Sequence, residues 1–153
     1  MLIPIDTAFR FTGFKESVAG NRDETSRSQL SRLERGFCAA SDFDTDHAMQ
    51  GYLHPFIYRA ERLHDAIWFW EFIGASATAQ PVKETLLALL GVFGEPGPGD
   101  YGDAVFEVAE SSPEWEAQFS VWEETYSAQS GWADGFEDFL RQRDIDPVTF
   151  WKT

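Results

Sequence analysis

The residues that could do chemistry are few, and one pair has a spacing known from metal enzymes. Glu61 and His64 form a Glu-x-x-His pair, which puts a carboxylate and an imidazole on one helix face in di-iron bundles. Such bundles need a second copy of the pair and two more glutamates on facing helices, and the sequence has no second copy. A small helical metal-dependent enzyme that uses Glu61, His64 and Glu71 is therefore only an alternative. We expect no catalytic residue, no metal ligand and no cofactor.

Three closely spaced aspartates resemble the opening of a calcium-binding loop. They are Asp42, Asp44 and Asp46. A calcium hand needs glycine at its sixth position for a sharp turn and glutamate at its twelfth as a bidentate ligand. Positions 47 and 53 hold histidine and leucine instead, so both requirements fail. We interpret residues 41–46 as an ordinary acidic connection.

The other reactive side chains favour structural interpretations. Cys38 follows Phe37 and has no histidine nearby in the sequence, so it is expected to be a buried thiol, and as the single cysteine it excludes an intramolecular disulfide. The loop 97–99 lacks the lysine of a phosphate-binding loop and is flanked by acids. Glu71 stands among aromatic residues, so we expect it to be largely buried with an arginine or hydroxyl partner.

Composition limits the possible classes more than any motif does. The chain has 153 residues, 43% of them hydrophobic and 16% aromatic, with a net charge of −14. One domain of this size can bury a core, and the apolar content is too high for a disordered acidic chain. The charge argues against direct binding to nucleic acid or to an anionic membrane. The N-terminal residues have no signal-peptide pattern, so we expect a cytoplasmic protein.

The negative charge is confined to one part of the chain. Residues 1–83 contain nine basic and eleven acidic side chains and are nearly neutral, whereas residues 84–140 contain thirteen carboxylates and no lysine or arginine. A merely solvated surface, or adaptation to high salt, could also enrich acids. Salt adaptation should act along the whole chain, however, and concentrated like charges repel one another. A cationic partner would relieve that repulsion.

Apolar spacing predicts a mainly α, single-domain helical bundle of five or six helices over residues 1–153, with a short N-terminal β-hairpin as an option for the first 20 residues. A helix is expected from Asp23 or Thr25 to about residue 40, followed by a central buried helix over 55–73. Another is expected from Pro81 to Gly94. Residues 101–110 are open to strand or helix, the next helix begins near Ser111, and the last one runs from Phe136 to Arg143.

The helix after Ser111 has the clearest pattern. Trp115, Phe119, Trp122 and Tyr126 follow i, i+4, i+7, i+11 and lie on one face. Ser111 with Glu114 suits a helix start. We therefore expect these aromatic residues to be core and the intervening glutamates to face solvent.

These observations favour a binding protein over an enzyme. We expect an acidic inhibitor, of the kind that acts as an immunity protein against a cationic toxin or a nucleic-acid-acting enzyme, with a mimic of DNA as a variant. A structural module whose acidity only aids solubility is the third option. Trp132, beside three acids, is expected to be the exposed aromatic anchor. The predicted partner-binding residues are Glu107, Glu110, Glu114, Glu116, Glu123, Glu124, Trp132, Asp134, Glu137 and Asp138.

Overall fold

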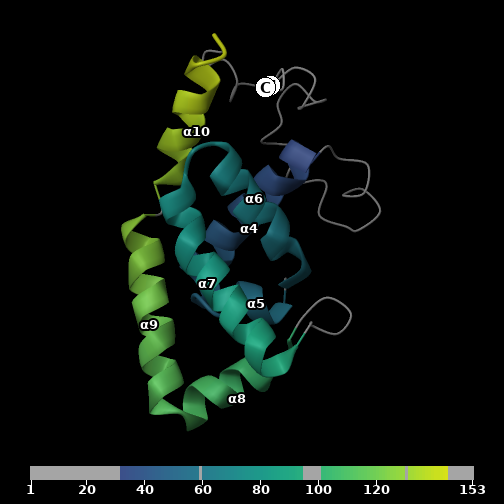
Figure 1. Ribbon diagram of the computed structural model, residues 1–153, viewed down its shortest axis with the longest axis vertical. Coiled ribbons are helices and arrows are strands. Elements are labelled where there is room, and N and C mark those ends of the chain that lie inside the picture. Colours follow the sequence, from purple (N-terminus) through teal and green to yellow (C-terminus); the bar gives the residue numbers. More distant parts are fainter. Residues whose placement is uncertain (1–31, 59, 95–100, 130, 145–153) are drawn as a thin grey trace.

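The computed structural model describes residues 32–58, 60–94, 101–129 and 131–144 (Figure 1). These residues form helices and connections and contain no β-strand. The expected N-terminal hairpin and the loop 97–99 lie outside the described residues. The prediction of a mainly α fold is confirmed. The helices are α4 (Arg32–Gln50), α5 (His54–Tyr58), the 3₁₀ turn η1 (Ala60–Arg62), α6 (Leu63–Phe72), α7 (Ser76–Phe93), α8 (Ala104–Ser111), α9 (Pro113–Ala128) and α10 (Trp132–Arg141).

Helices α4 and α6 pack together at the centre of the fold, and α7 joins them on the side of α6. The expected central helix over 55–73 is helical along most of its length, but it is divided into α5, η1 and α6. Phe69 and Trp70 of α6 are fully buried, as a helix that is apolar on all sides should be. Phe43 of α4 packs edge-on against Trp70, with ring centroids 5.6 Å apart.

Helix α4 is longer than its sequence suggests. It runs through residues 41–46, so the prediction of an acidic connection there is wrong. The helix ends where Gly51 adopts a φ of +97° and its amide donates to the His47 carbonyl oxygen, 3.1 Å away. Glycine adopts this left-handed conformation at no steric cost, which is why helices commonly end beside one.

Helix α7 begins five residues before Pro81, so the prediction of this proline in the first turn is wrong. Residues 76–80 extend the helix because Thr78 and Ala79 are buried within it. The predicted stop at Gly94 is confirmed, since this residue adopts a φ of +74° directly after α7. Among the described residues, no helix is both long enough and apolar enough to cross a membrane.

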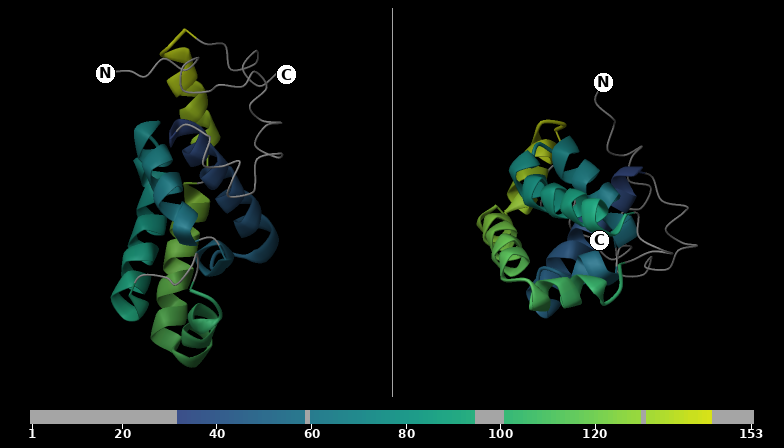
Figure 2. Two further views of the ribbon diagram at one scale, coloured as in Figure 1. Left: turned by 90° about the vertical axis from the view of Figure 1, so that its right-hand side faces the viewer. Right: turned by 60° about the horizontal axis from the view of Figure 1, so that its bottom comes forward.

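The last three helices run along the outer edge of the molecule. Helix α8 crosses the lower end, α9 runs alongside α7, and α10 continues to the opposite end (Figures 1 and 2). The undecided segment 101–110 is thus largely helical. The predicted start of α9 is confirmed within one residue: Pro113 is its first residue, and the Ser112 hydroxyl accepts from the Trp115 amide at 3.4 Å.

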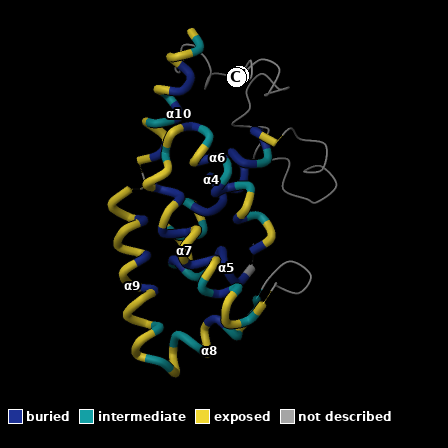
Figure 3. Tube along the Cα trace, viewed as in Figure 1, coloured by how far each residue is buried: buried dark blue, intermediate teal, exposed yellow. Residues whose placement is uncertain are grey.

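The predicted aromatic stripe of α9 is confirmed. Phe119, Trp122 and Tyr126 are buried, and Trp115 is half-buried. The Trp122 indole also donates to the Glu84 carboxylate of α7 at 3.0 Å. Helix α9 is therefore fixed against α7, and most of its remaining surface is exposed (Figure 3).

We predict that Gly36→Ala destabilises the fold, because α4 and α6 approach each other too closely there for a Cβ atom. A Cβ atom at position 36 would lie 2.6 Å from the Phe69 Cβ and 3.0 Å from the Asp65 carbonyl oxygen. Such overpacking should lower the free energy of unfolding by about 1–3 kcal/mol, measured by chemical denaturation. Gly91→Ala is the matched control, since nothing lies within 4 Å of its added Cβ. That change should stabilise α7 by up to about 1 kcal/mol, and equal effects of the two changes would refute the close approach.

Candidate protein-binding surface

Six exposed carboxylates on α8 and α9 form what we call the acidic surface. All six belong to the predicted binding residues. None of them forms an ion pair with a lysine or arginine among the described residues, and the single pairing is between Glu123 and the Nε2 atom of His47, at 3.4 Å. The acidic surface consists of Glu107, Glu110, Glu114, Glu116, Glu123 and Glu124.

Helix geometry explains why these side chains face outward. The aromatic stripe of α9 occupies the side toward α7, which leaves Glu124 on the opposite side and Glu116 and Glu123 on one flank. On α8, Val105 faces inward, and Glu107 and Glu110 lie one turn apart on the outer side. The six carboxylates are therefore all exposed, but those of α9 lie on more than one side of the helix.

The acids of α10 are partly neutralised. Arg141 places one nitrogen 3.2 Å from the Asp138 carboxylate and another 3.3 Å from that of Glu137. Asp134 is exposed and has no such partner among the described residues. These three predicted residues therefore carry less net charge than the acidic surface.

Trp132 is not the exposed anchor that we expected. Its side chain is only 7% exposed, and its ring packs edge-on against Phe37 and Phe69. The expectation of an exposed indole is wrong, because α10 begins at this residue and its indole is turned into the core. Its indole N–H donates to the carboxylate of Asp44.

Phe106 of α8 is the exposed aromatic residue on the acidic side. Its exposed fraction is 38%, and Val121 on α9 is exposed by 54%. The sequence did not decide between strand and helix for residues 101–110, so it could not predict whether Phe106 is buried or exposed. A helical assignment would have placed it on the outer side of α8, close to Glu110.

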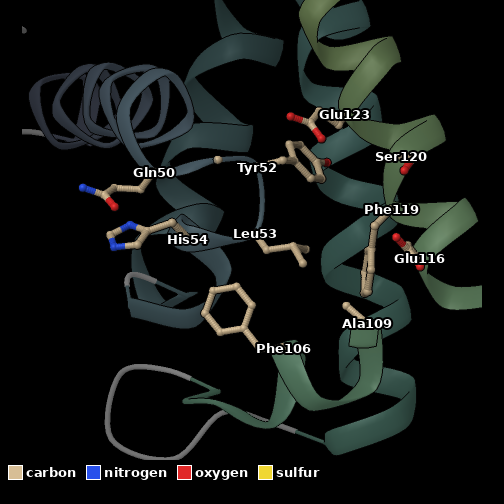
Figure 4. A pocket seen from close by; sticks show the side chains of 11 residues that line it. Gln50, Tyr52, Leu53, His54, Phe106, Ala109, Glu116, Phe119, Ser120 and Glu123 are labelled. Atoms are coloured by element: carbon tan, nitrogen blue, oxygen red, sulfur yellow. The ribbon is translucent and has the colours of Figure 1, made fainter. Parts of the chain in front are cut away.

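A pocket of about 250 Å³ lies between the turn at residues 50–54 and the α8–α9 hairpin (Figure 4). Sequence reasoning missed it, since its walls come from segments more than 50 residues apart. The apolar walls include Leu53, Phe106 and Phe119, and two carboxylates of the acidic surface, Glu116 and Glu123, also line it.

The three aspartates of α4 anchor other elements of the fold. A carboxylate oxygen of Asp42 lies 3.6 Å from Arg62, and one of Asp46 lies 3.5 Å from Nδ1 of His54. The Asp44 carboxylate accepts hydrogen bonds from the Tyr126 hydroxyl and the Trp132 indole. Burial raises the pKa of Asp44 to about 6, although the hydrogen bond from Trp132 opposes this shift.

The residues of the alternative enzyme are all exposed. They are Glu61, His64 and Glu71. The expectation that Glu71 is buried is wrong: its carboxylate lies 3.4 Å from the Lys83 ammonium group at the surface. Nowhere in the described part of the chain do three or more histidine, cysteine or acidic side chains gather as metal ligands would. Cys38 is buried, as expected.

We predict that Asp44→Asn changes the pH dependence of stability. Because the pKa of Asp44 in the folded state, about 6, lies above its ordinary value of 3.8, this group favours the folded state fully below pH 3.8. The contribution is lost as the pH rises through 6. The unfolding free energy of the wild type, minus that of the variant, should fall by about 2 kcal/mol between pH 4 and pH 7.

Denaturation of both proteins across this pH range, with NMR titration of the Asp44 carboxyl group, measures the effect. A difference that stays constant with pH would contradict the raised pKa.

Known proteins give no guide to the function, so the functional argument rests on the acidic surface. No protein-family model, curated protein or solved structure matches the chain.

Proposed function

We propose that the protein is an acidic inhibitor that neutralises a basic protein partner, as an immunity protein neutralises a toxin. The partner would be a toxin or a nucleic-acid-acting enzyme, and it would bind to the acidic surface of α8 and α9. The observation that carries this proposal is the set of six exposed carboxylates without a lysine or arginine partner among the described residues.

The electrostatic argument starts from the local charge. Residues 84–140 contain no lysine or arginine at all, so neighbouring basic groups along α8 and α9 do not compensate the glutamates. Concentrated charge of one sign attracts a partner of the opposite sign over a Debye length, about 8 Å at physiological salt. Such steering raises association rates by about 10–10³-fold. Fast capture is what an inhibitor needs when its partner must be stopped before it acts.

The acidic surface is also held in a fixed position. Ser112 caps α9, the Trp122 indole binds Glu84, and the Tyr126 hydroxyl binds Asp44. A surface that is ordered before binding loses less conformational entropy when the partner docks.

Apolar side chains near the carboxylates supply contact area. Phe106 and Val121 are partly exposed on α8 and α9. Aromatic residues contribute more interface energy than rim charges, so Phe106 takes the role that was expected for Trp132. The glutamates then act mainly on association rate and partner choice.

A purely solubilising role explains the distribution less well. Solubility depends on net charge, which could be spread over the whole chain. Here residues 1–83 are nearly neutral, and the excess lies within residues 84–140. Placing the acids together adds repulsion that a dispersed arrangement would avoid.

The first test compares two variants that each remove three negative charges. Glu107→Gln/Glu110→Gln/Glu114→Gln alters the acidic surface, and Glu61→Gln/Asp65→Asn/Glu71→Gln is the matched control beside α6. Each protein is immobilised and exposed to host lysate at low and high salt, and retained proteins are identified by mass spectrometry. We expect a positively charged protein on the wild type and the control, with about tenfold less on the acidic-surface variant.

High salt should release the same protein, because screening weakens steered encounters. Competition of the purified complex with duplex DNA distinguishes a DNA mimic from another inhibitor. Equal retention by both variants, or a partner without net positive charge, would refute the assignment of the acidic surface.

The acidic surface should also destabilise the free protein. We predict that Glu107→Gln/Glu110→Gln raises the free energy of unfolding by about 0.5 kcal/mol, because like charges one turn apart repel. Glu61→Gln/Glu71→Gln removes carboxylates that lie 3.6 Å from Arg62 and 3.4 Å from Lys83, so it should not stabilise. Urea denaturation measures both variants, and the gain should disappear in 1 M salt. A gain that persists in 1 M salt would have another cause.

A further inference from the structure

We infer that the pocket between residues 50–54 and the α8–α9 hairpin receives one arginine side chain of the basic partner. This inference rests on the proposed function and specifies the recognition chemistry at one point of the acidic surface. It follows from the volume of the pocket, its apolar walls and its two carboxylates.

The volume of the pocket suits a single side chain. Small-molecule sites usually measure about 300–1,000 Å³, and this pocket measures about 250 Å³. In Figure 4 the side chains of Leu53, Phe106 and Phe119 surround an open space between the two segments. The aliphatic stem of a long side chain could lie along these walls.

The charges that line the pocket favour a cation. Glu116 is exposed and has no ion-pair partner among the described residues. Glu123 is paired with the imidazole of His47, 3.4 Å away, which a stronger cation could displace. On the opposite wall, Nδ1 of His54 lies 3.5 Å from the Asp46 carboxylate, so this imidazole has an acidic neighbour of its own.

The aromatic walls favour arginine over lysine. A guanidinium group is planar, stacks on aromatic faces and binds a carboxylate with two parallel hydrogen bonds, whereas an ammonium group is a compact, strongly hydrated charge. Phe106 and Phe119 supply the faces, and Glu116 supplies the carboxylate. Cation–π contact and a paired carboxylate then act on the same group.

A second pocket of similar volume among the described residues lacks these features. It lies between the start of α7 and α10, and its walls are mostly glycine and alanine, with Thr78, Gln129 and Trp132. None of its side chains carries a charge, so it has no means of selecting a cationic group.

The test uses the full-length protein and three capped tripeptides, so it does not depend on the partner. The peptides are Gly-Arg-Gly, Gly-Lys-Gly and Gly-citrulline-Gly, in which citrulline is a neutral analogue of arginine. Titrations are followed by amide NMR shifts and fitted for Kd. We expect the arginine peptide to bind at least about fivefold more tightly than the other two, with shifts centred on residues 50–54, 106–109 and 116–123.

Variants locate the site. Glu116→Gln/Glu123→Gln should weaken arginine binding by about tenfold, and the matched Glu107→Gln/Glu110→Gln should change it by less than twofold. Phe106→Ala should weaken it about threefold, since an exposed cation–π contact contributes about 0.5–1 kcal/mol. Val121→Ala is its control outside the pocket.

Equal binding of the arginine and citrulline peptides would refute the requirement for a positive charge. Equal binding of the arginine and lysine peptides would refute the preference for a guanidinium group. Shifts spread over α8 and α9, or no saturable binding, would overturn the pocket itself. Each of these results leaves partner capture by the acidic surface as a separate measurement, so the inference can fail while the proposed function stands.

Discussion

The carboxylate of Asp44 joins α4 to two helices that are far from it in the sequence. It accepts hydrogen bonds from Tyr126 and Trp132, which lie 82 and 88 residues further along the chain. Removing a carboxylate from water is unfavourable, and the pKa of about 6 reflects this. Two donors on one carboxylate offset part of that desolvation and join both α9 and α10 to α4. This junction therefore contributes to the placement of α9 and α10 against α4.

The structure separates its acids into two populations with opposite roles. The aspartates of α4 point toward partners inside the fold: an arginine, a histidine, and the hydroxyl and indole on Asp44. The glutamates of α8 and α9 point outward, and within the described part of the chain the single ion pair they form is with a histidine. Acids of the first kind hold the fold together. Acids of the second kind repel each other, which is the basis for proposing a cationic partner.

Local periodicity explains which parts of the fold could be predicted. The stripe on α9 was predictable because four aromatic residues repeat at helical spacing, so burial follows from α9 alone. The helical state of residues 41–46 was not, because a run of aspartates favours a turn unless distant groups satisfy the carboxylates. Those groups lie on α5, η1, α9 and α10. The prediction of an exposed Trp132 was wrong for the same reason, since its indole is bound by a carboxylate 88 residues away in the sequence.

Because Trp132 is buried, a partner of the acidic surface would need a different aromatic contact. The Trp132 indole is buried and donates to Asp44, so α10 has no exposed aromatic residue. Arg141 also partly neutralises the acids of α10. On α8 and α9, Phe106 and Glu116 line the same pocket. Charge and apolar contact therefore coincide there, and affinity needs both: charge brings a partner close, but buried apolar contact keeps it bound. We therefore propose the α8–α9 hairpin, rather than α10, as the part of the acidic region that a partner contacts.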